Sequence, residues 1–406
     1  MLSNGDHVER LAHLAVHTGV ALQPGQDVVV LGFDVAHAPL VRAIAEEAYV
    51  AGARLVSAVY WDQHVKRSRL RHAPADSLDL VPAWWDTMVR DLRAAHGALI
   101  TVWDDPAPDL LGDVDGARAG RDQMPLSPSL MAAAGSGDLA WTMVPGPSAA
   151  FARRVLGRDD EAEAWRVLAS ILRLDAPDPA AAWREHVQRL EERAGLLQER
   201  ELDAVRFRGE GTDLTVGLLR GARWMAGGLT TNFGVKTVAN MPTEEVFTTP
   251  DFRRTEGVVR MTRPMPLSGG ATVEGLRLRF AGGRAVAVDA DRGADAVRAQ
   301  MAADPGAARL GEVALVDGAS PVGRSGLVFN NLLIDENATS HIAWGAAYAF
   351  TMPDLPAGEA EQEALGFNRS GVHQDAMIGG PGVDVHGIDA AGDEVAIVVD
   401  DAWVLT

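Results

Sequence analysis

The sequence predicts an α/β protein in two parts: an N-terminal α/β domain with a largely parallel sheet, and a C-terminal α+β domain with mainly antiparallel strands. Two observations carry this prediction. In the first half, short apolar runs alternate with helical patterns, and in the second half hairpin-like patterns replace that alternation. A chain of 406 residues is long enough for two domains, which we place at residues 1–200 and 201–406.

The first half is expected to contain strands separated by helices. The predicted strands are residues 27–33, 54–61, 98–103 and 139–144. Residues 38–50 form a helical pattern with Leu40, Val41 and Ile44 on one side, and Gly52 is suited to end that helix. Further helices are predicted at residues 80–95, 159–174 and 179–200. Apolar strands between helices indicate a parallel sheet that is covered on both faces.

The second half has the pattern of antiparallel strands. The predicted strands include residues 202–208, 213–219 and 272–280. The turn sequence Ala-Gly-Gly-Arg separates residues 276–280 from residues 285–288, which predicts a hairpin. A second hairpin is expected between residues 383–388 and 394–405.

Composition excludes several classes of protein. A hydrophobic fraction of 47% and a charged fraction of 23% are ordinary for a soluble globular chain. The net charge of −19 argues against nucleic-acid binding, which depends on cationic side chains. No apolar run is long enough to cross a membrane, and the N-terminus does not resemble a signal peptide. With no cysteine, the chain has neither disulfides nor thiolate ligands, and we expect a cytoplasmic protein.

Residues 331–348 contain the strongest chemical signal. Glu336 precedes His341 by five residues, and Tyr348 follows seven residues later. We expect a helix that begins after Glu336, near Asn337, and that carries His341 and Tyr348 on one side about two turns apart. Histidines and carboxylates are ligands of divalent metals.

A second candidate histidine lies downstream of this segment. His373 and Asp375 lie two residues apart in a predicted strand, so both side chains are expected on one face. Together with His341 and Glu336, they predict a metal site. The alternative is that each histidine is a hydrogen-bonded core or surface residue without a metal.

Two further carboxylate positions are candidates. Glu244 and Glu245 are adjacent in an apolar stretch after Pro242, so an extended backbone would direct only one of them toward a given site. Glu312 lies inside the apolar run 311–316, where a buried charge needs a partner or a metal. An edge strand with Glu312 facing water is the alternative, and spacing alone favours it.

Other sites of chemistry are not indicated. The chain has no Gly-x-Ser-x-Gly nucleophile motif, no phosphate-binding loop, no dinucleotide fingerprint and no His-Glu-x-x-His motif. We therefore expect no organic cofactor. Asp384 and His386 form another acid–histidine pair, which we interpret as structural.

Four ordered motifs point to a known family. They are residues 240–251 (NMPTEEVFTTPD), 310–316 (LGEVALV), 324–348 (RSGLVFNNLLIDENATSHIAWGAAY) and 366–379 (GFNRSGVHQDAMIG). The chain resembles the thermophilic aminopeptidase family of metallopeptidases over nearly its whole length. The resemblance implies an enzyme that releases residues from peptides with a free N-terminus. It also implies two divalent metals, with zinc or cobalt expected and magnesium or manganese as alternatives, and a homodimer.

The resemblance also implies roles for individual residues. By motif, the metal ligands would be Glu245, Glu312, Glu336, His341, His373 and Asp375. The motif leaves one residue of ambiguity, so Glu244 is the fallback for Glu245. Tyr348 matches the family's active-site tyrosine, and Glu244 would move a proton to the leaving amine. A water activated by the two metals would attack the peptide bond.

Two other functions remain open at this point. A mononuclear non-haem iron dioxygenase needs only His341, His373 and Asp375, which leaves the three glutamate ligands without a purpose. A non-catalytic binding protein with a structural metal would lack an open coordination position.

Overall fold

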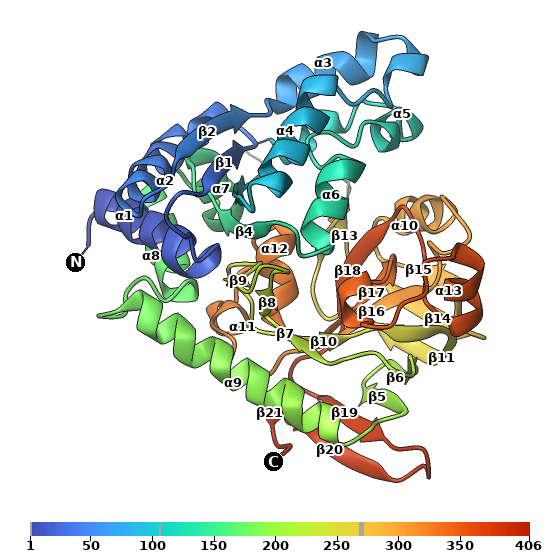
Figure 1. Cartoon of the computed structure of the whole chain (residues 1–406). Coiled ribbons are helices and arrows are strands. Elements are labelled where there is room, and N and C mark those ends of the chain that lie inside the picture. The colour runs from blue at the N-terminus through green and yellow to red at the C-terminus, as the bar shows by residue number, and fades with distance from the viewer. Residues whose placement is uncertain (1, 105–106, 268–271) are drawn as a thin grey trace. The chain divides into compact units, whose positions relative to one another are not determined.

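The computed structural model describes residues 2–104, 107–267 and 272–406 (Figure 1). The chain forms two compact units. The first contains Met1–His186 and Gly228–Pro242, and the second contains Val187–Gly227 and Thr243–Thr406. The chain therefore enters the second unit, returns to the first, and then completes the second. The functional division at residue 200 stays a prediction.

The first unit is built on a four-stranded parallel sheet, as predicted. Its strands are β1 (Asp27–Gly32), β2 (Leu55–Tyr60), β3 (Ala98–Trp103) and β4 (Ala140–Pro145). They pair in the order β2-β1-β3-β4, and each pair is parallel (Figure 1). The inner strands β1 and β3 are almost entirely buried, whereas Leu55 on the edge strand β2 is 53% exposed. A strand needs apolar residues on both faces only where other segments cover both faces of the sheet.

The predicted helices of this region are present with small changes at their ends. They are α2 (Ala38–Val50), α4 (Ala83–Ala94), α8 (Glu161–Ile171) and α9 (Pro179–Glu199). A further helix, α1 (Asn4–Leu14), begins at a capping box formed by Ser3 and Asp6 and continues into a π-helical turn at Ala15–Gly19.

Four short helices were not predicted. They are α3 (Gln63–His72), α5 (Gly116–Arg121), α6 (Pro128–Gly135) and α7 (Ala149–Leu156). Each follows an aspartate or serine whose side chain accepts a hydrogen bond from the first turn. Short helices depend on such caps and on packing more than on a long periodic pattern.

The hairpin β8 (Gly228–Thr230) and β9 (Lys236–Val238) completes the first unit. The hydroxyl of Thr142 on β4 donates a 2.7 Å hydrogen bond to the carbonyl of Val238.

The second unit contains an antiparallel sheet of eight strands, in agreement with the prediction for this half. Its strands are β5 (Ala204–Gly209), β6 (Thr212–Leu218), β11 (Pro250–Arg260), β14 (Arg277–Ala281), β15 (Arg284–Asp289), β19 (Val383–Ile388), β20 (Glu394–Val399) and β21 (Ala402–Trp403). Their order is β15-β14-β11-β6-β5-β19-β20-β21. Both predicted hairpins are present, as β14–β15 and β19–β20.

The predicted strand at residues 272–280 is wrong in its length. Described residues within it form β13 (Thr272–Val273), which pairs with β12 (Met265–Pro266), and then the separate strand β14. Gly275 between them has a φ of +60°, a left-handed conformation that interrupts an extended strand.

A second antiparallel sheet of five strands lies in the same unit. Its strands are β7 (Met225–Ala226), β10 (Val246–Thr248), β16 (Leu310–Leu315), β17 (His341–Gly345) and β18 (His373–Met377). They pair in the order β18-β17-β16-β10-β7 (Figure 1). One apolar core joins both sheets and includes Phe207 and Val216 from the larger sheet and Val313 and Ile342 from the smaller one. The helices α10 (Ala294–Met301), α11 (Pro321–Ser325), α12 (Leu332–Asp335) and α13 (Glu359–Leu365) connect these strands.

Candidate metal centre

Glu312 lies on β16, an inner strand of the five-stranded sheet, between β17 and β10. The residue is only 4% exposed. The expectation from spacing, an edge strand with Glu312 facing water, is therefore wrong. Strand order depends on pairing between distant segments, which a local apolar pattern does not contain.

The predicted helix that carries His341 and Tyr348 is also wrong. His341 begins β17, where it pairs with Ala314 on one side and Met377 on the other. Tyr348 follows the strand and precedes a short 3₁₀ turn. Ile342 and Trp344 are common strand residues, and backbone pairing with two neighbouring strands overrides the spacing that suggested a helix.

The prediction of a strand at His373 is confirmed. His373 and Asp375 lie on β18, two residues apart. The Nδ1 atom of His373 lies 2.8 Å from the carbonyl oxygen of Ala346. Its Nε2 atom lies 3.5 Å from both Asp375 Oδ1 and Glu312 Oε2, and 3.1 Å from the hydroxyl of Tyr348. The contact with the carbonyl orients the ring so that Nε2 faces the carboxylates.

Glu244 and Glu245 directly precede β10, and both are buried. Glu245 Oε2 lies 3.0 Å from His341 Nε2. Glu244 is held through its backbone N–H, which donates a 2.7 Å hydrogen bond to Asn337 Oδ1. The two neighbours therefore make different contacts, as alternation along an extended segment requires.

Asn337, which the sequence predicts only as a helix cap, is buried beside the candidate ligands. It follows Glu336 in a 3₁₀ turn that comes directly after α12. Its side-chain amide donates to the carbonyl of Leu333, and its own carbonyl accepts a 2.6 Å hydrogen bond from Ser320. Asn337 thus ties the loop of Glu244 to the turn that carries Glu336. A buried asparagine beside a candidate ligand is the signal that could have indicated this role.

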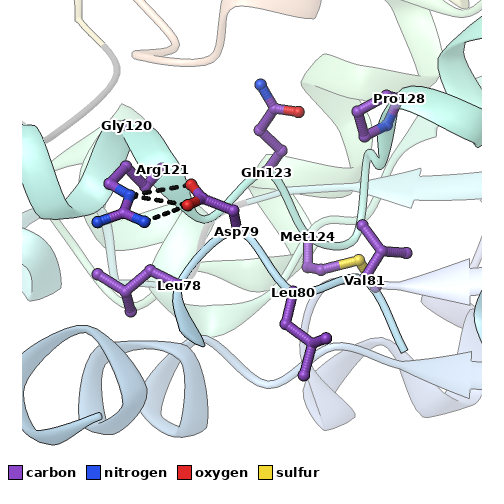
Figure 2. A pocket seen from close by; sticks show the side chains of 9 residues that line it. All are labelled: Leu78, Asp79, Leu80, Val81, Gly120, Arg121, Gln123, Met124 and Pro128. Atoms are coloured by element: carbon purple, nitrogen blue, oxygen red, sulfur yellow. Dashed lines mark hydrogen bonds and ion pairs between the residues drawn. The ribbon is translucent and has the colours of Figure 1, made fainter. Parts of the chain in front are cut away.

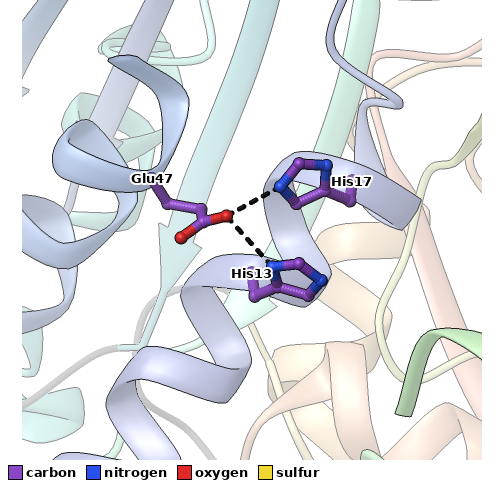
Figure 3. Close-up of side chains that lie close together, drawn as sticks. All are labelled: His13, His17 and Glu47. Carbon is purple, nitrogen blue, oxygen red and sulfur yellow. Dashed lines mark hydrogen bonds and ion pairs between the residues drawn. The ribbon is translucent and has the colours of Figure 1, made fainter. Parts of the chain in front are cut away.

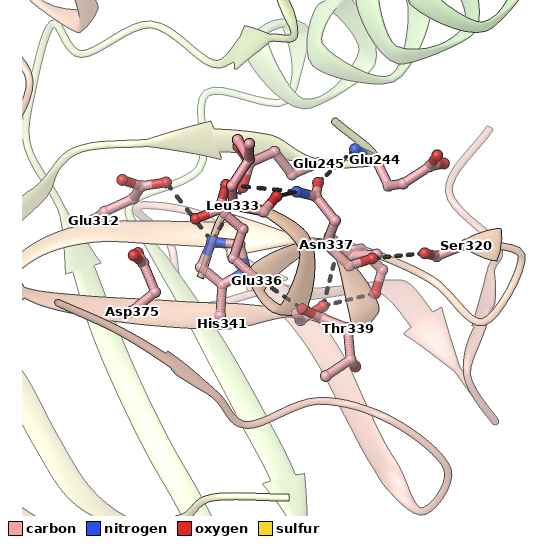
Figure 4. A network of polar contacts seen from close by, with 12 residues as sticks. Glu244, Glu245, Glu312, Ser320, Leu333, Glu336, Asn337, Thr339, His341 and Asp375 are labelled. Carbon is pink, nitrogen blue, oxygen red and sulfur yellow. Dashed lines mark hydrogen bonds and ion pairs between the residues drawn. The ribbon is translucent and has the colours of Figure 1, made fainter. Parts of the chain in front are cut away.

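Among the described residues, five of the six predicted ligands form two groups of three that share Glu312. Glu245, Glu312 and His341 make one group, and Glu312, His373 and Asp375 make the other, with ligand atoms within 4.8 Å of one another in each. Figure 4 shows the side chains of the first group together with Asp375. Among the described residues, neither Glu244 nor the predicted ligand Glu336 belongs to either group.

Burial and mutual repulsion control the protonation of the carboxylates. Burial, followed by the charge of Glu245, raises the pKa of Glu312 to about 8. Burial, together with the charges of Asp375 and Glu245, raises the pKa of Glu336 well above its usual range. Neighbouring carboxylates that cannot all ionise in a low-dielectric site show such upward shifts.

The neighbouring carboxylates raise the pKa values of the two histidines, against the effect of burial. Burial by itself would lower the pKa of His341, but the hydrogen bond and charge of Glu245 raise it to about 10. Burial likewise opposes protonation of His373, yet the charge of Asp375 raises its pKa to about 9. The site therefore stabilises positive charge strongly.

This donor set fits divalent metal ions. Three carboxylates lie close to two imidazoles, and Glu336 interacts electrostatically with the same residues, so acidic groups outnumber the basic ones. Buried carboxylates in such excess are normally balanced by a metal. Imidazole nitrogens together with carboxylate oxygens suit zinc, cobalt and manganese.

An aromatic cluster borders the second group. The ring of Tyr348 is stacked on Phe350, with ring centroids 5.1 Å apart, and meets Phe247 edge-on at 6.3 Å. It also lies 4.6 Å from the His373 ring. These contacts hold the Tyr348 hydroxyl beside His373.

The first unit contains a separate hollow of about 330 Å³ (Figure 2). Leu78, Val81 and Met124 contribute apolar walls, and the ion pair between Asp79 and Arg121 lies at its side. None of its lining residues belongs to the two ligand groups.

The chain is similar to known metallopeptidases over nearly its whole length. The sequence profile of the family described as thermophilic metalloprotease (M29) matches residues 4–403. Aminopeptidase T of Thermus thermophilus is 39% identical over 98% of each chain. Aminopeptidase T of Thermus aquaticus is 40% identical over 98% of this chain and 99% of its own, and aminopeptidase PepS of Streptococcus thermophilus is 34% identical over 98% of each.

Two solved structures are similar to the whole chain. Wild-type AmpT from Thermus thermophilus superposes with a TM-score of 0.89 at 38% identity, covering 99% of this chain and 100% of that one. A 2,5-dihydroxypyridine dioxygenase from Pseudomonas putida KT2440 superposes with a TM-score of 0.55 at 14% identity, covering 100% of this chain and 99% of that one. The second likeness shows a shared fold alone.

Within the described residues, no helix has the length and apolar composition needed to cross a membrane. The profile match spans nearly the whole sequence, and the relatives are at least 34% identical over 98% of the chain. The chain therefore belongs to the thermophilic metalloprotease family M29 and is a metalloaminopeptidase.

Proposed function

We propose that the chain removes N-terminal residues from peptides by means of two divalent metal ions. The proposed ligands are Glu245, Glu312, Glu336, His341, His373 and Asp375. The observation that carries the proposal is the position of Glu312, which belongs to both ligand groups. Its Oε1 atom lies 3.9 Å from His341 Nε2, and its Oε2 atom lies 3.5 Å from His373 Nε2. One carboxylate therefore offers a separate oxygen to each group.

The expected ions are zinc or cobalt, with magnesium or manganese as alternatives. When bound, they would supply an acidified water and a positive charge that polarises the scissile carbonyl. Side chains of this protein would stabilise the oxyanion and carry the proton to the leaving amine.

Tyr348 is the proposed hydrogen-bond donor to the oxyanion that develops on the scissile carbonyl. Its hydroxyl lies 3.1 Å from His373 Nε2, beside the second ligand group. Burial, followed by the charge of Glu312, raises the pKa of Tyr348 well above its usual range. The hydroxyl therefore keeps its proton and remains able to donate.

Glu244 is the proposed proton carrier to the leaving amine. It adjoins the ligand Glu245 in the chain, and its backbone is fixed by Asn337. A glutamate outside the two ligand groups can exchange a proton without giving up a bond to a metal.

The peptide is proposed to approach from the side of His373. The side chain of His373 is 21% exposed, whereas that of His341 is 1% exposed. The excess of carboxylates would attract the positively charged α-amine of the substrate. The related aminopeptidases support peptides as substrates. A homodimer and a cytoplasmic location stay predictions from the sequence.

An iron dioxygenase that uses only His341, His373 and Asp375 is the alternative. The dioxygenase that superposes at 14% identity shares the fold with this chain, and that likeness carries no argument about function. In this chain His341 contacts Glu245, and both histidines approach Glu312. An iron site with two histidines and one carboxylate does not require these glutamates as ligands.

The test is hydrolysis of aminoacyl-p-nitroanilides and of unblocked peptides by the purified protein. We expect EDTA to abolish the activity, zinc or cobalt to restore it, and N-acetylation of the peptide to prevent cleavage. Failure to release an N-terminal residue from a broad peptide panel would refute the proposal. Oxygen consumption with one iron per chain would support the dioxygenase.

A further inference from the structure

A third cluster of potential metal ligands lies on the surface of the first unit (Figure 3). His13 Nδ1 and His17 Nε2 lie 3.0 Å and 2.7 Å from one oxygen, Oε1 of Glu47. The three side chains are 53%, 37% and 26% exposed, in that order. Two imidazoles thus converge on a single carboxylate that solvent can reach.

The backbone holds these three side chains in place. His13 lies in α1, and His17 follows four residues later in the π-helical turn. Glu47 lies on α2, which packs against α1. The apolar faces of the two helices are buried, including Leu14 on α1 and Ile44 on α2. The helices therefore position the ligand atoms without requiring an ion between them. Single π-helical turns inside helices occur often at functional sites.

We infer that His13, His17 and Glu47 bind a divalent transition-metal ion, with zinc as the leading candidate. Two of the three donors are imidazole nitrogens, which suit zinc, copper or nickel and do not suit magnesium or calcium. Tetrahedral zinc with ligands at about 2.0 Å separates neighbouring ligand atoms by roughly 3.3 Å. The present separations of 2.7 Å and 3.0 Å need to widen by only a few tenths of an ångström. Exposed side chains make such a change easily.

The inferred ion would link α1 to α2. The three side chains leave a coordination position for water. They belong to neither of the two ligand groups that share Glu312, which together form the proposed catalytic cluster. Binding of an ion at this surface site therefore depends on residues that the proposed catalysis does not use. The competing explanation is that the three side chains are only hydrogen-bonded to one another, without an ion. Exposed ion pairs between histidine and glutamate contribute little to stability.

The test measures zinc in the full-length protein. Wild type, His13→Ala/His17→Ala and the control His64→Ala are stripped with EDTA and equilibrated with the same buffered free zinc. His64 is an exposed histidine of α3, outside all three ligand groups. We expect the double variant to bind one zinc fewer per chain than wild type and control. We also expect it to lose part of the zinc-induced rise in melting temperature while peptidase activity is unchanged. Equal zinc content and equal melting shifts in all three proteins would overturn the inference.

Two further variants keep the result interpretable. Glu47→Gln preserves the shape of the carboxylate and removes its charge, so it must also lose the zinc; it decides the question if the double variant fails to fold. Glu312→Gln alters the proposed metal centre of the second unit, and adding His13→Ala/His17→Ala to it must remove one further zinc. If the combined variant binds as much zinc as Glu312→Gln alone, the ion that the double variant loses belongs to that centre, and the surface site is refuted. This readout does not depend on the proposed peptidase mechanism.

Discussion

His341 Nε2 lies 3.0 Å from Glu245 Oε2, and the two side chains are 1% and 9% exposed. The contact joins the start of β17 to the residue that directly precedes β10. The sequence leaves a one-residue ambiguity between Glu244 and Glu245 as the metal ligand. A carboxylate oxygen this close to a candidate histidine ligand favours Glu245.

The first prediction separates the roles of these adjacent glutamates. Glu245→Gln should lose bound metal and peptidase activity together, because an amide is a much weaker ligand than a carboxylate. Glu244→Gln should keep the metal and lower kcat by about 10² to 10⁴, the usual contribution of a general acid or base. Metal analysis and steady-state kinetics on the same preparations check both outcomes. The reverse pattern would make Glu244 the ligand and Glu245 the proton carrier.

The second prediction concerns the hydroxyl of Tyr348. Tyr348→Phe should lower kcat by about 10² to 10³, the usual effect of removing one oxyanion donor. Metal content should be unchanged, because the tyrosine contacts His373 without being a proposed ligand. Tyr60→Phe, at a partly exposed position on β2, is the matched control and should behave as wild type. Loss of metal in Tyr348→Phe would instead give the hydroxyl a role in holding His373.

The parts of the fold that local patterns describe could be predicted from the sequence. Strands β1 and β3 are continuous apolar runs between helices, and β18 places His373 and Asp375 two residues apart on one strand. The motifs predict the ligands of the candidate site, and their roles stay predictions.

The parts that depend on long-range pairing could not be predicted in this way. His341 has helical spacing to Tyr348, but pairing with β16 and β18 makes it part of a strand. Glu312 has the local pattern of an edge strand, but β17 and β10 flank it. The role of Asn337 depends on contacts with Glu244 and Ser320, which are distant in sequence.

The third prediction is that metal removal destabilises the second unit. Without a cation, buried carboxylates repel one another, and this repulsion contributes to the raised pKa values of Glu312 and Glu336. Zinc at 100 times its dissociation constant should stabilise the folded state by about 2.7 kcal/mol per site. Thermal unfolding of the His13→Ala/His17→Ala variant, with EDTA or with zinc, separates the proposed metal centre of the second unit from the proposed surface site. An unchanged melting temperature in this variant would show that zinc binding to the cluster does not favour the folded state.

The fourth prediction concerns the acid stability of the first unit. His37, in the turn after β1, is 2% exposed, and burial lowers its pKa from 6.5 to about 4. Asp104 Oδ2 lies 4.0 Å from His37 Nε2, but that carboxylate is already paired with Arg154, so desolvation dominates.

Between these two pKa values the unfolded chain binds the proton and the folded chain does not, so stability falls as the pH falls. The loss from His37 between pH 6.5 and pH 5 should be on the order of 1 to 2 kcal/mol. Melting temperatures of wild type and His37→Gln at both pH values measure it, with His64→Ala as the exposed control. The drop should be smaller in His37→Gln than in the other two proteins. An equal drop in all three would mean that His37 is protonated in the folded state, with Asp104 acting as its counter-ion.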